Sequence, residues 1–208
     1  YGLSPDCDFP ADICHEDDGT LTLILDSNVI PTGSHNLSFI KNCIAVSAIS
    51  ISLGIEWDDL KKRIQSFSAP KGRCQVRQVN DITIIDDTYN ANLTSSLAAL
   101  DYLNAFSGDG RKIFVFGDMF ELGATANNQH QKIGEHCSDL NLDGVFTIGE
   151  HTRYTNSALN NQILSKHFDT KENLILSLKQ TLKSGDKILF KGSRGMAMDK
   201  IIEGVFFS

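Results

Sequence analysis

The chain has 208 residues, of which 41% are hydrophobic, and its formal net charge is −7 at pH 7. This length allows one large domain or two small ones with a buried core, and the negative charge without a long basic run argues against nucleic acid or a membrane surface as a partner. The five cysteines are odd in number and never form C-x-x-C, so we expect neither a disulfide framework nor a zinc site. The chain begins with tyrosine rather than methionine, which suggests a piece of a longer protein, and no signal-peptide pattern opens it, so a cytoplasmic location is expected.

The first 70 residues contain one predicted strand and two predicted helices. Residues 21–25 read as a strand, whereas residues 37–53 are apolar but interrupted by lysine, asparagine and serine, which is typical of a core helix and not of a membrane span. Apolar residues at spacings of three and four from Trp57 to Phe67 predict an amphipathic helix. A proline and a glycine follow closely, and we therefore place a domain boundary near residue 70.

Strands and helices alternate in the remainder of the chain, residues 71–208. The predicted strands are residues 74–79, 81–86, 112–117, 145–149, a short segment around His167, and 187–191. The predicted helices are residues 94–106, 127–139, 151–160, 172–183 and a last one from about Met196, and Thr94 to Ser96 are expected to cap the first of them. This alternation predicts an α/β fold in which residues 71–208 form a Rossmann-like, doubly wound, mostly parallel sheet.

Three polar loops fall at the predicted carboxyl ends of strands, where ligands bind in open α/β sheets. They are Asp86 to Asn92 (D-D-T-Y-N-A-N), Gly117 to Gly123 (G-D-M-F-E-L-G) and Lys191 to Gly195 (K-G-S-R-G), and we expect all three to open on the same edge. The amides and cations of the last loop suit a carboxylate or phosphate. By itself, this pattern is more often a glycine-rich turn with solvated cations.

The individual acidic and histidine residues suggest structural roles more than an acid/base machine. Asp86 and Asp87 are adjacent in a strand, so only one can face the site, and either could instead serve the following helix terminus. Asp118 and Glu121 are expected to close their loop. His130 is expected on one helix face with Gly134 and Cys137, and no metal-ligand set is predicted in this chain.

The best-marked catalytic motifs are absent from these 208 residues. There is no G-x-x-x-x-G-K-[ST] loop and no G-x-G-x-x-G after a strand, which excludes the usual P-loop mode of nucleotide binding within this sequence. There is also no G-x-S-x-G elbow, so hydrolase interpretations are weak.

Taken together, the three loops closely resemble, in order and spacing, the D-D-[ST]-Y-N-A-N, G-D-M-x-E-L-G and K-G-S-R motifs of the Mur ligase family. The resemblance covers essentially the whole chain: residues 71–208 look like the C-terminal ligase domain, and residues 1–70 look like the end of a central α/β ATPase domain. It implies an ATP-dependent, amide-forming ligase of bacterial peptidoglycan synthesis. In the best-matching member, ATP phosphorylates the terminal carboxylate of UDP-N-acetylmuramoyl-tripeptide, and the amine of D-alanyl-D-alanine attacks the acyl phosphate.

The resemblance also implies roles for particular residues. Arg73 and Asp87 would be catalytic and, with Asn42, would bind the nucleotide. The other implied contacts are Tyr89, Asn90 and Asn92 lining the substrate cleft, and Lys191, Ser193 and Arg194 on the dipeptide side. ATP and Mg²⁺ are the implied cofactors, both held by sequence upstream of this chain, and a monomer is expected. An arginine beside phosphate oxygens and a fixed cation beside a carboxylate suit phosphoryl and acyl transfer.

Two departures from the family pattern affect the nucleotide side. The family has H-N-x-x-N at the start of a helix, whereas here Ser38 stands in the place of the histidine, although Asn42 fits, and a displaced His35-Asn36 lies three residues earlier. Either this loop carries an insertion or the adenine contact is altered. The P-loop, the magnesium ligands and the modified lysine of the family belong to upstream sequence, so we expect no ligation by this chain alone.

Three alternatives remain at this level. One is a sister ligase that adds an amino acid to another UDP-muramyl or folyl acceptor. A second is a non-catalytic Rossmann-like module that binds a dipeptide or a nucleotide. The third is a soluble α/β domain whose loops carry no specific function.

Overall fold

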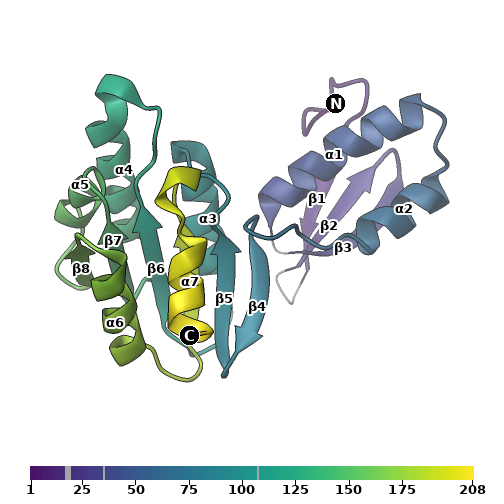
Figure 1. Ribbon diagram of the computed structural model, residues 1–208. Helices are drawn as coiled ribbons and strands as arrows, with labels where there is room; N and C mark the ends of the chain where they lie inside the picture. The colour runs from purple at the N-terminus through teal and green to yellow at the C-terminus, as the bar shows by residue number, and fades with distance from the viewer. Residues whose placement is uncertain (17–19, 35, 107) are drawn as a thin grey trace. The chain divides into compact units, whose positions relative to one another are not determined.

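The structure is a computed structural model that describes residues 1–16, 20–34, 36–106 and 108–208 (Figure 1). The chain divides into two units, Tyr1–Ser68 and Ala69–Ser208. The predicted His35 lies outside the described residues, so its part in the altered loop stays a prediction. In the part of the chain that is described, no helix has the length and apolar character needed to cross a membrane.

The first unit is a three-stranded antiparallel sheet with two helices. Its elements are β1 (Ala11–His15), β2 (Leu21–Leu25), β3 (Asn28–Ser34), α1 (Leu37–Ser52) and α2 (Trp57–Gln65), with the strands in the order β1-β2-β3. The predicted strand and both predicted helices are confirmed, but β1 and β3 were missed. Pro31 and Gly33 read as strand breakers, and β3 tolerates a proline because it lies at an edge of the sheet.

The core of the first unit forms between the middle strand and the inner faces of the helices. Leu23 and Leu25 of β2 pack with Ile40 and Ile44 of α1 and with Leu60 of α2. The helix α1 begins after Asn36, whose side chain accepts a hydrogen bond from the backbone N–H of Phe39 at 3.1 Å. An asparagine in this position satisfies one of the free amides of the first turn, so Asn36 has a structural role.

The second unit is built on a six-stranded sheet. The strands are β4 (Gln75–Val79), β5 (Ile82–Asp87), β6 (Lys112–Gly117), β7 (Gly144–Ile148), β8 (Leu164–Phe168) and β9 (Lys187–Lys191), in the order β4-β5-β9-β6-β7-β8. All neighbouring strands run parallel except the edge pair β4–β5, which is antiparallel. The predicted α/β class with a mostly parallel sheet is confirmed.

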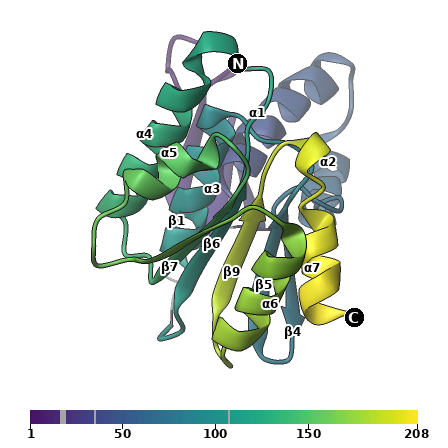
Figure 2. The ribbon, with the colours of Figure 1, turned by 60° about the vertical axis from the view of Figure 1, so that its left-hand side comes forward.

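Helices cover both faces of this sheet (Figure 1 and Figure 2). One face carries α3 (Leu93–Ala105), α4 (Ala126–Asp139) and α5 (Thr152–Ser157), and the other carries α6 (Lys171–Thr181) and α7 (Asp199–Phe206). Successive strand residues point to opposite faces, so Ile85 belongs to the core under α3 whereas Ile84 belongs to the core under α7. Burial on both faces explains why the central strands are almost purely apolar.

Several element boundaries differ from the prediction, including the three that follow. The last helix begins at Asp199 and not at Met196, because Met196 ends a short 3₁₀ turn (Arg194–Met196) and the next residue, Ala197, has a left-handed φ of 46°. The cap of α3 is Asn92, two residues before the predicted capping segment Thr94 to Ser96. The helix α5 ends at Ser157 instead of residue 160.

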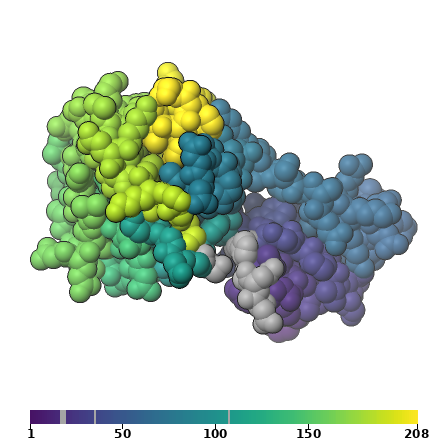
Figure 3. Space-filling view, turned by 90° about the horizontal axis from the view of Figure 1, so that it is seen from below, coloured from purple at the N-terminus to yellow at the C-terminus, as the bar shows by residue number. Residues whose placement is uncertain are grey.

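Figure 3 shows α7, in yellow, beside the blue β4–β5 pair. Val79 of β4 packs against the same core cluster as α7.

Candidate functional site at the carboxyl edge of the sheet

The three polar loops open on one edge of the second unit. β9 lies between β5 and β6 and pairs with both in parallel, so the segments that follow these strands emerge side by side. The prediction that the loops share an edge is therefore confirmed. Their side chains, however, differ in whether they face solvent or hold the loops together.

Asp87 and Lys191 form a buried ion pair at the centre of this edge. They are register partners on β5 and β9, and the Nζ atom of Lys191 lies 2.5 Å from Oδ2 of Asp87. The Lys191 side chain is only 2% exposed and that of Asp87 is 13% exposed. The ammonium also donates to the backbone carbonyl of Asn90 at 3.0 Å. Lys191 therefore fixes the D-D-T-Y-N-A-N loop at two points, Asp87 and Asn90.

The segment that leads into the second unit is attached to the same loop. The backbone N–H of Cys74 donates to Oδ1 of Asp87 at 3.0 Å, and that of Tyr89 donates to the carbonyl of Gly72 at 2.9 Å. Between these two bonds, the guanidinium carbon of Arg73 lies 4.0 Å from the centroid of the Tyr89 ring. The structure thus brings Arg73, Asp87 and Tyr89 together, although they come from two segments of the chain.

Asp86 faces away from Asp87, as two successive strand residues must. Its carboxylate is fully buried, accepts from Nη2 of Arg77 at 3.0 Å and accepts from the hydroxyl of Thr88 at 2.7 Å. The expectation that only one of these two adjacent carboxylates can face the loop edge is confirmed. Asp86 ties the edge strand β4 to the start of the loop.

Asp118 joins the G-D-M-F-E-L-G loop to the segment that opens α5. Asp118 accepts from the backbone N–H groups of Glu150, His151 and Thr152, which open α5. Because these amides lie at a helix N-terminus, the carboxylate also favours the helix dipole there. The expected structural role of Asp118 is confirmed. Glu121 is exposed, with a left-handed φ of 64°.

His130 supports the middle of the same loop from α4. Its Nε2 atom accepts from the backbone N–H of Met119 at 2.9 Å, and its Nδ1 atom contacts the carbonyl of Ala126 at 2.7 Å. These two partners require a neutral imidazole with the proton on Nδ1. Burial lowers the pKa of His130 below its ordinary value, which agrees with that form. As predicted, His130 shares a buried helix face with Gly134 and Cys137.

Several residues assigned to substrates by the resemblance make contacts within the protein. Ser193 is buried, and its hydroxyl accepts from the backbone N–H of Phe120 at 2.8 Å. Asn92 caps α3 by accepting from the N–H of Ser95 at 2.8 Å. Asn90 is exposed, and its carbonyl oxygen Oδ1 accepts from the N–H of Ala91 at 2.9 Å.

The two remaining predicted residues are solvent-facing. The Arg194 side chain is 68% exposed, with its Nη1 atom 3.7 Å from the carboxylate of Asp199. Asn42 is exposed on α1 and belongs to the first unit, whereas Arg73 and Asp87 belong to the second.

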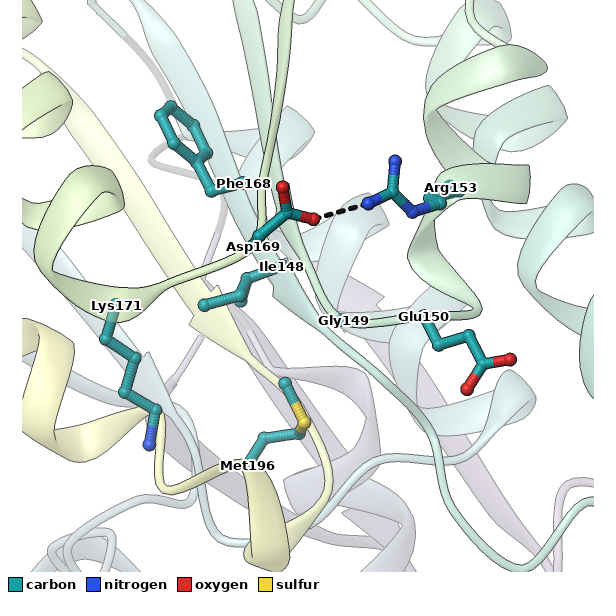
Figure 4. Close-up of a pocket in the computed structure, with 8 residues that line it drawn as sticks. All are labelled: Ile148, Gly149, Glu150, Arg153, Phe168, Asp169, Lys171 and Met196. Carbon is teal, nitrogen blue, oxygen red and sulfur yellow. Dashed lines mark hydrogen bonds and ion pairs between the residues drawn. The ribbon is translucent and has the colours of Figure 1, made fainter.

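A pocket of about 440 Å³ opens farther along the same edge, after β7 and β8. In Figure 4, Lys171 and Met196 lie on one side of it and Arg153 and Glu150 on the other, and Arg153 forms an ion pair with Asp169. Sequence reasoning missed these residues because only three of the strand ends carried a recognisable motif. The general rule that ligands bind at strand carboxyl ends would have drawn attention to the segments after β7 and β8 as well.

The acidic, histidine and cysteine side chains do not suggest a metal centre in this part of the protein. Within the described ranges, which omit residues 17–19, 35 and 107, no group of three such side chains is placed to hold a metal ion. No disulfide joins any two of the five cysteines, all of which lie in the described ranges. We therefore assign no Mg²⁺ ligand to these residues.

Comparison with known proteins adds the following findings. The family model described as "Mur ligase, glutamate ligase domain" matches residues 72–194. The UDP-N-acetylmuramoyl-tripeptide–D-alanyl-D-alanine ligase of Synechocystis is 34% identical over 185 residues, which cover 86% of this chain and 40% of that protein. The ligase of the same name from Bacillus subtilis is 30% identical over 217 residues, which cover 100% of this chain and 47% of that protein. The chain thus spans less than half the length of these relatives.

Solved structures that are similar to this chain include two titled as MurF. A crystal structure of MurF from Acinetobacter baumannii matches with a TM-score of 0.84 and 25% identity, covering 97% of this chain and 46% of that one. The MurF ligase from Thermotoga maritima, solved in complex with ADP, matches with a TM-score of 0.78 and 25% identity, covering 95% of this chain and 46% of that one.

Proposed function

Because this chain belongs to the Mur ligase family, we propose that it is the C-terminal part of the ATP-dependent ligase that joins D-alanyl-D-alanine to UDP-N-acetylmuramoyl-tripeptide. Residues 1–70 would then be the end of the central ATPase domain, and residues 71–208 the C-terminal domain. The observation that supports this most is the convergence of Arg73, Asp87 and the buried Lys191 at one edge of the sheet. The names of the relatives described above agree with it.

On the nucleotide side, we propose that Arg73 is the group that meets phosphate oxygens. Its guanidinium rests on an aromatic ring and, among the described residues, forms no ion pair with a carboxylate, so its positive charge is not neutralised there. Such a cation stabilises the charge that develops when the γ-phosphoryl group of ATP passes to the substrate carboxylate and ADP leaves. Asp87 would act beside it, and Asn42 would contact the nucleotide from the first unit.

Lys191 and Ser193 are better explained as supports than as direct ligands of the dipeptide. The ammonium of Lys191 is committed to Asp87 and Asn90, and the hydroxyl of Ser193 to Phe120. We propose that Lys191 fixes the carboxylate of Asp87 and that Ser193 joins the K-G-S-R loop to the G-D-M-F-E-L-G loop. Support of this kind keeps reacting groups within the narrow geometry that acyl transfer needs.

For the dipeptide, the charged pocket after β7 and β8 supplies suitable groups. D-alanyl-D-alanine carries a carboxylate and an amine. The cation of Lys171 suits the carboxylate, since Arg153 is already paired with Asp169, and the Glu150 carboxylate on another part of the lining suits an ammonium group. The amine would attack the acyl phosphate of the tripeptide once deprotonated, releasing phosphate and forming the amide. Arg194, Asn90 and Asn92 would border the approach.

ATP and Mg²⁺ need binding groups beyond those identified in these 208 residues. They contain no P-loop sequence, so we propose that ATP and Mg²⁺ are held chiefly by further sequence of a longer protein and that this chain alone does not catalyse ligation. With ATP and a nucleotide-linked precursor as substrates, the reaction would take place in the cytoplasm. We propose a monomer.

The proposal is tested in the complete protein by Arg73→Ala and Asp87→Asn. We expect each to lower turnover, measured as ADP release with both acceptor substrates, by tenfold or more while the far-UV CD spectrum is retained. Arg63→Ala, at an exposed position of α2, is the matched control and should keep full turnover. A wild-type protein that binds D-alanyl-D-alanine or nucleotide without turnover would instead be a binding module, and turnover with another amino acid in place of the dipeptide would indicate a sister ligase.

A further inference from the structure

The ring of Tyr89 forms a platform for Arg73. Tyr89 is 48% exposed at the carboxyl end of β5, and the guanidinium carbon of Arg73 lies 4.0 Å from its ring centroid. A separation of this size places the cation on the face of the ring, where the quadrupole attracts it. The two residues come from different segments, so this contact is a tertiary one.

The backbone on both sides of Arg73 is held in place by the loop that carries Tyr89. Gly72 accepts from the N–H of Tyr89 at 2.9 Å, and the N–H of Cys74 donates to Asp87 at 3.0 Å. Gly72 has a left-handed φ of 79°, and a Cβ atom there would lie 3.1 Å from the Tyr89 nitrogen. With the backbone fixed, the main freedom left to Arg73 is in its side-chain torsions, which the ring restricts.

A ring differs from a carboxylate in what it leaves available on the guanidinium. Stacking occupies the flat face of the group, whereas the N–H donors point outward from its edge and can still bond two phosphate oxygens. A carboxylate partner would have consumed those donors and cancelled the charge. The ring therefore lowers the entropy lost on binding without weakening the charge.

We propose that Tyr89 is a positioning residue for Arg73, holding its guanidinium ready for the phosphates of the nucleotide. This inference rests on the proposed function. It differs from a substrate-binding role for Tyr89 in one decisive way. Positioning needs only the aromatic ring, whereas a hydrogen bond to substrate needs the hydroxyl group.

The test uses the complete ligase and the variants Tyr89→Phe, Tyr89→Leu, Arg73→Ala and Tyr89→Leu/Arg73→Ala. We expect Tyr89→Phe to keep kcat/KM for ATP within twofold of the unaltered protein and Tyr89→Leu to lose roughly two- to fivefold, the range for an exposed cation–π contact. The loss should be smaller in kcat/KM for the dipeptide. In the Arg73→Ala background, Tyr89→Leu should have no further effect. Tyr154→Leu, another exposed tyrosine, is the matched control.

A second readout does not depend on activity. In the NMR spectrum of this chain, the Cδ protons of Arg73 should be shifted upfield by the ring current in the unaltered protein and in Tyr89→Phe, and this shift should disappear in Tyr89→Leu. Equal activity losses in the Phe and Leu variants, additive losses in the double variant, or no ring-current shift would each overturn the positioning role. Absence of ADP release by the unaltered complete protein would instead overturn the proposed function.

Discussion

Lys191 of β9 and Asp87 of β5 are register partners whose charged groups meet at 2.5 Å in an almost fully buried position. The pair joins two loops of the candidate site. Removing one member of such a pair leaves an uncompensated buried charge, which typically costs about 3–5 kcal/mol.

We therefore expect Lys191→Met to lower the free energy of local unfolding around β5 and β9 by about 3 kcal/mol or more. Amide hydrogen exchange of the two strands measures this, because it reports the second unit separately from the first. Lys191→Met/Asp87→Asn should recover part of the loss, since the buried charge is then removed. Lys200→Met, at an exposed position of α7, is the control. A loss for Lys191→Met no larger than that of the control would contradict the importance of the pair.

A second prediction concerns the pH dependence that arises from His130. Burial lowers its pKa in the folded protein, although Asp118 at 3.9 Å acts in the opposite direction and His151 acts with burial. As the pH falls below about 6.5, His130 therefore becomes protonated more readily in the unfolded chain than in the folded protein. Stability is highest above that pH and falls as the pH decreases, by at most about 1.4 kcal/mol per pH unit for this group.

His130→Gln should reduce this pH dependence, because the Gln side-chain oxygen can replace Nε2 as the acceptor for Met119 and does not titrate. Urea unfolding at pH 7.5 and at pH 5.0, followed by the NMR amide signal of Met119, measures the difference. Burial also lowers the pKa of His167, so His167→Gln should likewise reduce the pH dependence of stability, in addition to the effect of His130→Gln. An unchanged pH dependence in His130→Gln would show that the imidazole does not resist protonation.

A third prediction concerns the packing of α4 on α5 at Gly134. A Cβ atom at this position would lie 2.2 Å from the carbonyl oxygen of Thr155 and 2.8 Å from Cβ of Ala158. We expect Gly134→Ala to destabilise the second unit by about 1–3 kcal/mol, the usual cost of overpacking. In the matched control Gly204→Ala, the three atoms nearest the new Cβ belong to the Ile175 side chain, and the nearest, at 2.5 Å, is its terminal Cδ1, which can move aside. Its cost should be close to zero in urea unfolding, and equal costs for the two variants would contradict the rigid contact.

A fourth prediction concerns the pocket after β7 and β8. Replacing Lys171 by glutamine should raise KM for D-alanyl-D-alanine in the complete ligase by roughly fivefold to tenfold, because one cation for the carboxylate is lost. Since the interaction is made equally before and during reaction, kcat should change little. Lys166→Gln, an exposed lysine of β8 outside the pocket lining, should leave both constants unchanged. A lowered kcat with unchanged KM would argue that Lys171 acts elsewhere in the reaction.

The alternation of strands and helices in the second unit was predictable from sequence. The apolar runs of β5, β6, β7 and β9 are buried on both faces, and a parallel order places the ends of consecutive strands at one edge. In the first unit, β3 was not predictable because Pro31 is tolerated only where a strand has no partner on one side. That depends on strand order, which no local pattern contains.

The α/β class, the family and the three loops at the sheet edge could be predicted from the residues alone, because periodicity and motif spacing are local properties. Which polar residues in those loops face solvent depends on tertiary contacts. Lys191 and Ser193 looked like ligands in sequence, yet one is paired with Asp87 and the other bonds Phe120. Likewise, Arg73 and Tyr89 are sixteen residues apart and meet only because the antiparallel β4–β5 pair brings their segments together. Burial and pairing depend on which strands become neighbours, and that is set by packing across the whole unit.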